Sequence, residues 1–140
     1  MRGLWIIMAA SLLLTSCGSR SKALPQSNAI AKEITLDEQN LTQTISDTLQ
    51  IGRMRQGEII AQTIRLHNRC SKPMVILRQS TSCGCTTATY SREPIAPGAS
   101  CDITIEFDSQ GQNGWQMKLI EFYMAEKVTP LKIYIDAEVE

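Results

Sequence analysis

The chain has 140 residues, and its 14 Lys and Arg residues balance its 14 Asp and Glu residues, so the formal net charge at pH 7 is zero. This length allows one domain at most. The charge balance argues against the basic face that domains use to bind nucleic acid. Aromatic residues make up 5% of the chain, too few for a platform on which bases stack. We therefore expect no nucleic-acid partner.

The N-terminal residues have the order of features found in an export signal. A positive residue, Arg2, precedes the apolar run from Leu4 to Leu14, which is too short to span a bilayer as an ordinary helix. Small residues then lead to Cys17. This arrangement resembles a bacterial lipoprotein signal with its lipobox. The resemblance predicts a signal peptide over residues 1–16 and lipidation of Cys17, and an ordinary signal peptide with an incidental cysteine is the alternative.

Residues 17–43 are predicted to comprise the lipidated cysteine and a flexible tether. Small polar residues follow the anchor, Pro25 disfavours an early helix, and a short helix is expected over 29–38. No acidic residue occurs between the anchor and Glu33. By analogy with lipoprotein sorting rules, this predicts an outer-membrane lipoprotein that faces the periplasm.

From residue 44 onward, hydrophobic residues recur at every second position, which is the period of a half-buried strand. The clearest case is Cys101 to Phe107. We expect strands at about 45–51, 60–66, 74–79, 86–90, 101–107, 118–124 and 131–139. Between them lie turn signals such as Pro97-Gly98, which suits the centre of a type II turn. Short strands at this spacing predict an all-β antiparallel sandwich of about seven strands over residues 44–140.

A set of motifs in this region has a familiar order. In sequence these are Gly57-Glu58, His67-Asn68, Lys72-Pro73-Met74-Val75-Ile76, Ser82-Cys83-Gly84-Cys85-Thr86, Pro94-Ile95-Ala96-Pro97-Gly98 and Ile103-Thr104-Ile105-Glu106-Phe107. The order resembles the DUF1573 family of exported bacterial domains, which are common in lipoproteins of the Bacteroidetes. The resemblance implies an immunoglobulin-like sandwich of the ASH/MSP type in a Gram-negative periplasm, and it implies no particular activity. Cys70 and Cys101 depart from the family pattern.

Once Cys17 is set aside, four cysteines remain, and exported chains meet oxidising conditions in which thiols pair. In a sandwich, the end of the 60–66 strand is expected beside the start of the 101–107 strand. This placement brings Cys70 near Cys101, and a disulfide requires Cα atoms within about 7 Å of each other. A Cys70–Cys101 disulfide is therefore one prediction, and two unpaired buried thiols are the alternative.

The pair Cys83 and Cys85 has three interpretations. The two residues can form a strained disulfide of the labile, oxidising kind, with Gly84 easing the backbone, or a structural loop whose cysteines pack or pair without further chemistry. They are also the candidate metal residues, because two thiolates suit a soft ion such as Cu(I) or Zn. A structural zinc site needs four ligands, so Cys70, Cys101 or His67 would have to complete it.

The remaining motifs give no catalytic assignment. The single histidine, His67, is expected to point away from the buried face of its strand, so no Ser-His-Asp set can be assembled around it. We therefore expect a membrane-tethered domain that is not an enzyme, has no cofactor, and binds or scaffolds a protein partner, for instance by adding a strand to a sheet edge. The alternative function is a thiol redox partner or soft-metal carrier using Cys83 and Cys85.

Overall fold

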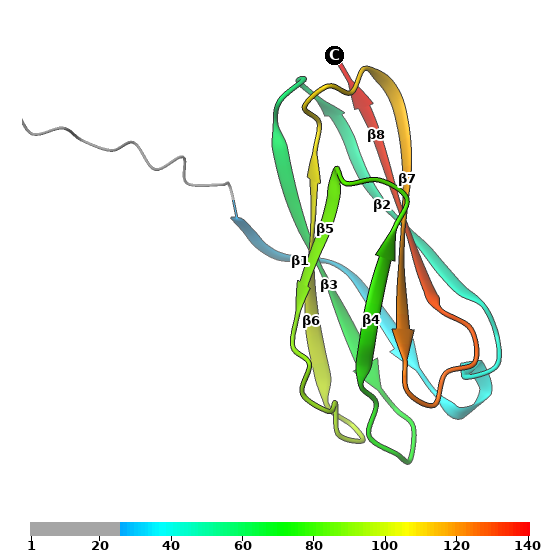
Figure 1. The fold of residues 1–140 in the computed structure, drawn as a ribbon. Helices are drawn as coiled ribbons and strands as arrows, with labels where there is room; N and C mark the ends of the chain where they lie inside the picture. Colours follow the sequence, from blue (N-terminus) through cyan, green and yellow to red (C-terminus); the bar gives the residue numbers. More distant parts are fainter. Residues whose placement is uncertain (1–25) are drawn as a thin grey trace, which may run out of the picture.

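The computed structural model describes residues 26–140, which fold into two packed β-sheets (Figure 1). The elements are β1 (Gln26–Leu36), η1 (Glu38–Asn40), β2 (Ile45–Met54), β3 (Ile59–Asn68), β4 (Ile76–Thr81), β5 (Thr86–Tyr90), β6 (Ser100–Asp108), β7 (Gly114–Met124) and β8 (Leu131–Val139). Sheet A has the strand order β1-β3-β6-β5, and sheet B has the order β2-β8-β7-β4. The predicted all-β sandwich is confirmed. It has eight strands, because β1 adds one to the seven expected.

The alternating residues of the central strands build the core. On β6, Ile103, Ile105 and Phe107 point inward and are at most 2% exposed. Phe122 on β7 and Ile133 on β8 meet them from the opposite sheet and are equally buried. Each of these large side chains contributes about 1.5–3 kcal/mol by leaving water. The period-two pattern therefore identified the buried face of each central strand correctly.

The edge strands on one side do not follow the antiparallel prediction. β1 runs parallel to β3, and β2 runs parallel to β8, whereas the remaining pairs are antiparallel. Both sheets are therefore mixed. The alternation of hydrophobic residues determines which face of a strand is buried, but it carries no information on the direction of the neighbouring strand.

Within the segment predicted as a flexible tether, Gln26–Leu36 form the strand β1, where a short helix was expected over 29–38. On β1, Ile34 and Leu36 are buried against the core. Asp37 then caps η1, with its carboxylate accepting hydrogen bonds from the backbone N–H groups of Gln39 and Asn40. Ile30, Ile34 and Leu36 share one strand face, a signal that the sequence contains. Cys17 and the predicted signal peptide lie outside the described residues.

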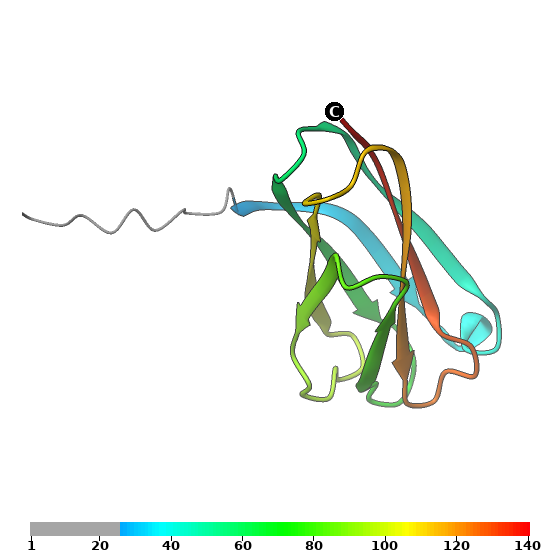
Figure 2. The ribbon, with the colours of Figure 1, turned by 45° about the horizontal axis from the view of Figure 1, so that its top comes forward.

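The β7–β8 loop lies beside η1, at the corner where the chain passes from β1 to β2 (Figure 2). A buried lysine of this loop secures the corner. The ammonium group of Lys127, in the β7–β8 loop, donates to the carbonyl oxygens of Asn40 at 3.0 Å and Gln43 at 2.6 Å, and to Thr129 Oγ1 at 3.3 Å. Burial lowers the pKa of Lys127. The lysine thus satisfies two carbonyl groups that no strand partner reaches. Residues 26–140 contain no helix with the length and hydrophobicity needed to cross a bilayer.

Candidate functional site

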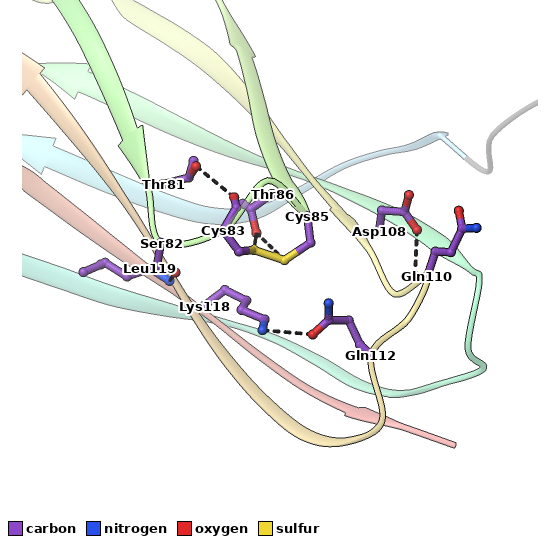
Figure 3. Close-up of a disulfide and its surroundings, with 10 residues drawn as sticks. All are labelled: Thr81, Ser82, Cys83, Cys85, Thr86, Asp108, Gln110, Gln112, Lys118 and Leu119. Carbon is purple, nitrogen blue, oxygen red and sulfur yellow. Dashed lines mark hydrogen bonds between the residues drawn. A yellow bond between two sulfur atoms is a disulfide. The ribbon is translucent and has the colours of Figure 1, made fainter.

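The connection from β4 to β5 carries the Cys-Gly-Cys motif and passes from sheet B to sheet A. Backbone hydrogen bonds hold it at both ends: Ser82 N donates to Leu119 O on β7, and Asp108 N donates to Cys85 O, each at 2.9 Å. Inside the loop, Thr81 Oγ1 donates to the carbonyl of Cys83 (Figure 3). The loop is therefore a fixed bridge between the two sheets.

Cys83 and Cys85 form a disulfide, with Cα atoms 5.2 Å apart. The buried hydroxyl of Thr86 lies 3.6 Å from the sulfur of Cys83 and 4.0 Å from that of Cys85 (Figure 3). Metal binding requires thiolates, so the bonded pair does not offer the soft ligands that the metal interpretation needs. Within residues 26–140, no group of three or more His, Cys, Asp and Glu side chains is placed to hold a metal ion.

Gly84 does not have the role expected of it. Its φ is not in the positive range, and a Cβ atom built at this position meets no atom within 4 Å. The loop therefore does not need a glycine to close the bridge. The turn at Gly98, in contrast, requires a glycine, because its φ is +80°. Ala99 N donates to Ala96 O, as in the predicted type II turn.

The predicted Cys70–Cys101 disulfide is not formed, and both thiols are free. Cys101 lies on β6, on one side of β3. Beyond the end of β3, Arg69 N donates to Leu36 O at 2.8 Å, so the chain turns towards β1, on the other side of β3. Cys70 is thereby carried away from β6 and becomes buried, and this burial raises the pKa of its thiol.

A row of polar side chains crosses the outer face of sheet A, and no sequence signal predicts it. His67 Nδ1 lies 2.8 Å from Ser100 Oγ, and His67 Nε2 lies 3.5 Å from Glu33 Oε2. Beside them, Arg65 binds both oxygens of Asp102, at 2.7 and 2.9 Å. The three strands that bring these residues together include β1, which was predicted as tether.

The first three residues of this row, Ser100, His67 and Glu33, invite comparison with a catalytic triad. In serine hydrolases the acid holds Nδ1 of the histidine, and Nε2 takes the proton of the serine. Here the two nitrogens have the opposite partners, and Glu33 is 62% exposed. Cross-strand polar pairs of this kind are common on sheet surfaces. We interpret the row as cross-strand pairing.

The four edge strands differ in how well they are protected against a further strand. Charged residues and irregular pairing mark three of them: β1 carries Lys32 and Glu33, β2 carries Asp47 and Arg53, and β4 carries Arg78, each with a register shift. Both features discourage strand addition. β5, with the sequence Thr-Thr-Ala-Thr-Tyr, has no charge, no proline and no register shift. Among the four edge strands of the described sheets, β5 alone has neither charge nor irregular pairing.

The free edge of β5 can be assigned from its pairing with β6. Cys85 lies opposite Asp108 and accepts its N–H, so this is a hydrogen-bonded pair. Such pairs alternate along an antiparallel ladder. Thr87 and Thr89 therefore bond to β6, whereas the N–H and C=O groups of Thr86, Ala88 and Tyr90 point to the open side.

A pocket of about 350 Å³ lies next to this edge, lined by Arg78, Gln79, Ala88, Thr89, Tyr90 and Arg92. β4 and β5, which contribute most of it, are drawn in green and lie side by side in Figures 1 and 2. The guanidinium carbon of Arg78 is 3.4 Å from the ring centroid of Tyr123, a cation–π contact that fixes its position. Gln79 Oε1 is buried without a hydrogen-bond partner in the described structure.

Sheet B also has exposed apolar side chains. Trp115 and Met117 on β7 point to the outer face and are 63% and 42% exposed. The indole N–H of Trp115 donates to Asp136 Oδ1 at 2.7 Å. β8 pairs with this part of β7, whereas β4 pairs with β7 only from Ile120 to Met124, so the stretch with Trp115 and Met117 has a partner strand on one side only.

The family model of DUF1573, described as a protein of unknown function, matches residues 42–139. No curated protein matches the chain. Among solved structures, a Porphyromonas gingivalis W83 protein of unknown function is similar, with a TM-score of 0.59 and 20% identity over 80% of this chain and 50% of that one. The Vibrio cholerae secreted serine protease VesC aligns with a TM-score of 0.52 and 13% identity, over 64% of this chain and 21% of that one. The VesB protease from the same organism aligns with a TM-score of 0.53 and 14% identity, over 66% of this chain and 30% of that one.

These structural similarities concern the fold alone. The chain spans half of the Porphyromonas gingivalis protein and smaller parts of the two proteases. The shared sandwich carries no information on chemistry, because one fold serves many functions.

Proposed function

The chain belongs to the DUF1573 family, and we propose that it is a non-catalytic binding or scaffolding domain that accepts an extended segment of a protein partner along β5. We propose further that a lipid on Cys17 holds it at the outer membrane, facing the periplasm. The domain then acts close to the membrane, and its partner is a protein of the same compartment.

The observation that supports the binding role is the unprotected edge of β5. An incoming strand would pair with the outward N–H and C=O groups of Thr86, Ala88 and Tyr90 without displacing any bond to β6. In such complexes the main-chain hydrogen bonds give affinity, and pockets for alternate side chains give specificity. The absence of charge and irregularity on β5 is costly unless the edge has a use, because such edges promote aggregation.

The binding proposal can be tested with a displayed library of random linear peptides, selected on the purified chain with its N-terminus as processed in the cell. We expect peptides that bind the wild type and lose binding to Ala88→Pro. Proline at this position removes an outward N–H and leaves the β5–β6 ladder intact. Peptide binding that Ala88→Pro leaves unchanged contradicts the proposal, as does a selection that enriches nothing.

A second variant tests the same edge independently, in case Ala88→Pro misfolds. Thr87→Lys/Thr89→Lys places charges on the exposed face of the edge strand, where both side chains point to solvent. Charges of this kind discourage strand addition. The melting temperature of each variant shows whether the fold is intact, and both variants are expected to lose the selected peptides.

The lipid anchor has an independent test. A fatty-acid analogue supplied to cells should label the wild type and not Cys17→Ser. An unlabelled wild type contradicts the anchor and leaves the binding proposal untouched.

A thiol redox role is the second candidate, and the bonded state of Cys83 and Cys85 favours it. In such a reaction a partner dithiol gives two electrons and two protons to the bridge, leaving two thiols here and a disulfide on the partner. Alkylation with and without a mild reductant measures this directly. A redox-active pair gains two labels at Cys83 and Cys85, and an inert structural bridge gains none.

A further inference from the structure

We propose that the pocket beside β5 holds a carboxylate group of the segment that pairs with this strand. The inference rests on the proposed binding function of β5. It adds the chemistry by which the partner is recognised.

The charge of the pocket suits an anion. Arg78 and Arg92 both line the pocket, and no acidic residue does. Within residues 26–140, neither guanidinium group forms an ion pair. Two cationic groups at one pocket without a counter-charge make a site complementary to an anion, and arginine binds carboxylates through two parallel hydrogen bonds.

Two of the lining side chains are prepared for a ligand. Arg78 is held in place by the ring of Tyr123, so less conformational freedom is lost when it binds a ligand. Gln79 adds a buried oxygen that lacks a donor. A buried acceptor without a donor is unfavourable, and an incoming main chain carries N–H donors.

The pocket also lies where a side chain of an added strand would point. A strand added to β5 lies about 4.8 Å from it, and its side chains alternate between the two faces of the sheet. Those on the inner face point towards the opposite sheet, whose edge on this side is β4. On β4, Gln79 faces inward opposite the buried Phe122 and Arg78 faces outward opposite Tyr123, and both side chains line the pocket. An acidic residue at one inner-facing position therefore reaches the pocket while its backbone pairs with β5. The carboxylate at a partner's C-terminus has the same chemistry.

The experiment uses the peptides selected on the purified chain, synthesised with blocked ends. We expect the binding peptides to share an Asp or Glu at one position, and its replacement by Asn or Gln to weaken binding about tenfold or more. Arg78→Gln/Arg92→Gln should produce a similar loss. The matched control, Arg55→Gln/Arg69→Gln, removes the same charge from exposed positions outside the pocket and should change binding less than about twofold. A requirement for an unblocked C-terminus identifies the terminal carboxylate as the bound group.

The outcomes separate this inference from the proposed function. Peptides that lack a carboxylate and bind Arg78→Gln/Arg92→Gln as well as the wild type overturn the inference. The β5 proposal survives that result as long as Ala88→Pro still abolishes binding. Because the Asp-to-Asn and Glu-to-Gln comparison uses the wild-type protein, it remains decisive even if the arginine variants are destabilised.

Discussion

The two open sides of the sandwich are built differently. On one side, β1 and β2 carry charges and register shifts, run parallel to their neighbours, and are joined at a corner that Lys127 ties to the β7–β8 loop. On the other side, β4 and β5 are joined by a disulfide-bridged loop, and β5 is neutral and regular. The first side is closed against a further strand, and the second has an edge that a partner can extend.

This difference indicates where stability and binding are located. Side chains of β1 enter the core, so changes there should cost folding free energy. The outward N–H and C=O groups of β5 make no contact in the described structure on which the fold depends. Changes to them should therefore affect partner binding more than stability.

The largest effect is expected at Leu36 on β1, which is completely buried. Leu36→Ala should lower the free energy of unfolding by about 2–5 kcal/mol, because it removes buried methyl groups and leaves a cavity. Urea denaturation measures the loss. The matched change on β5, Thr89→Ala at an exposed position, should stay within about 0.5 kcal/mol. Equal effects of the two substitutions would remove the contrast between the sides.

A smaller loss is expected at the corner between β1 and β2. Lys127→Met should cost about 1–3 kcal/mol, because the carbonyl groups of Asn40 and Gln43 lose a charged donor. Lys72→Met is the control, since Lys72 forms only an exposed ion pair with Glu126, worth at most about 1 kcal/mol. If Lys127→Met leaves the free energy of unfolding unchanged, water replaces the ammonium group and Lys127 does not hold the corner.

Removal of the disulfide between β4 and β5 should lower the free energy of unfolding by less again. Cys83→Ser/Cys85→Ser opens a bridge that joins residues two apart in sequence. Such a short loop contributes roughly 1.5 kcal/mol in the chain-entropy model. Gly84→Ala should be neutral by thermal melting, because this glycine adopts no positive φ and has open space around it. A marked loss in Gly84→Ala would show that the loop depends on glycine after all.

The smallest effect concerns pH. The hydrogen bond from Arg65 holds the pKa of Asp102 below its usual value, against a smaller opposing effect of burial. A carboxyl with a lowered folded-state pKa adds stability above its unfolded pKa of about 3.9, and this contribution is lost as the pH falls through the folded value. As the pH is lowered from 6 to 2, the midpoint of unfolding should therefore fall slightly less steeply for Asp102→Asn than for the wild type. Identical slopes would show that the exposed pair contributes nothing.

Much of the fold could be predicted from the sequence, because hydrophobic residues on the buried face of a strand recur at every second position. Cys101 to Phe107 and Leu131 to Val139 follow it without interruption, and both are strands as expected. β1 was missed although Ile30, Ile34 and Leu36 follow the same period, because polar residues and a proline precede it. The parallel pairing of β1 and β2 had no sequence signal, because side-chain alternation is the same in both directions.

The candidate site was only partly predictable. The pairing of Cys83 with Cys85 was one of the interpretations that their spacing allowed. The free state of Cys70 depends on which way the chain turns after β3, which hydrogen bonds to Leu36 decide. The pocket joins Arg78 on β4 to Arg92 beyond β5, and only the packing of two edges in opposite sheets brings these residues together.

The most direct test of the central claim is amide hydrogen exchange, residue by residue, with and without a selected peptide. Pairing along β5 predicts that the amides of Thr86, Ala88 and Tyr90 become protected on binding, in alternation with Thr87 and Thr89, which β6 already protects. Protection that appears instead around Trp115 and Met117, with β5 unchanged, would contradict the account.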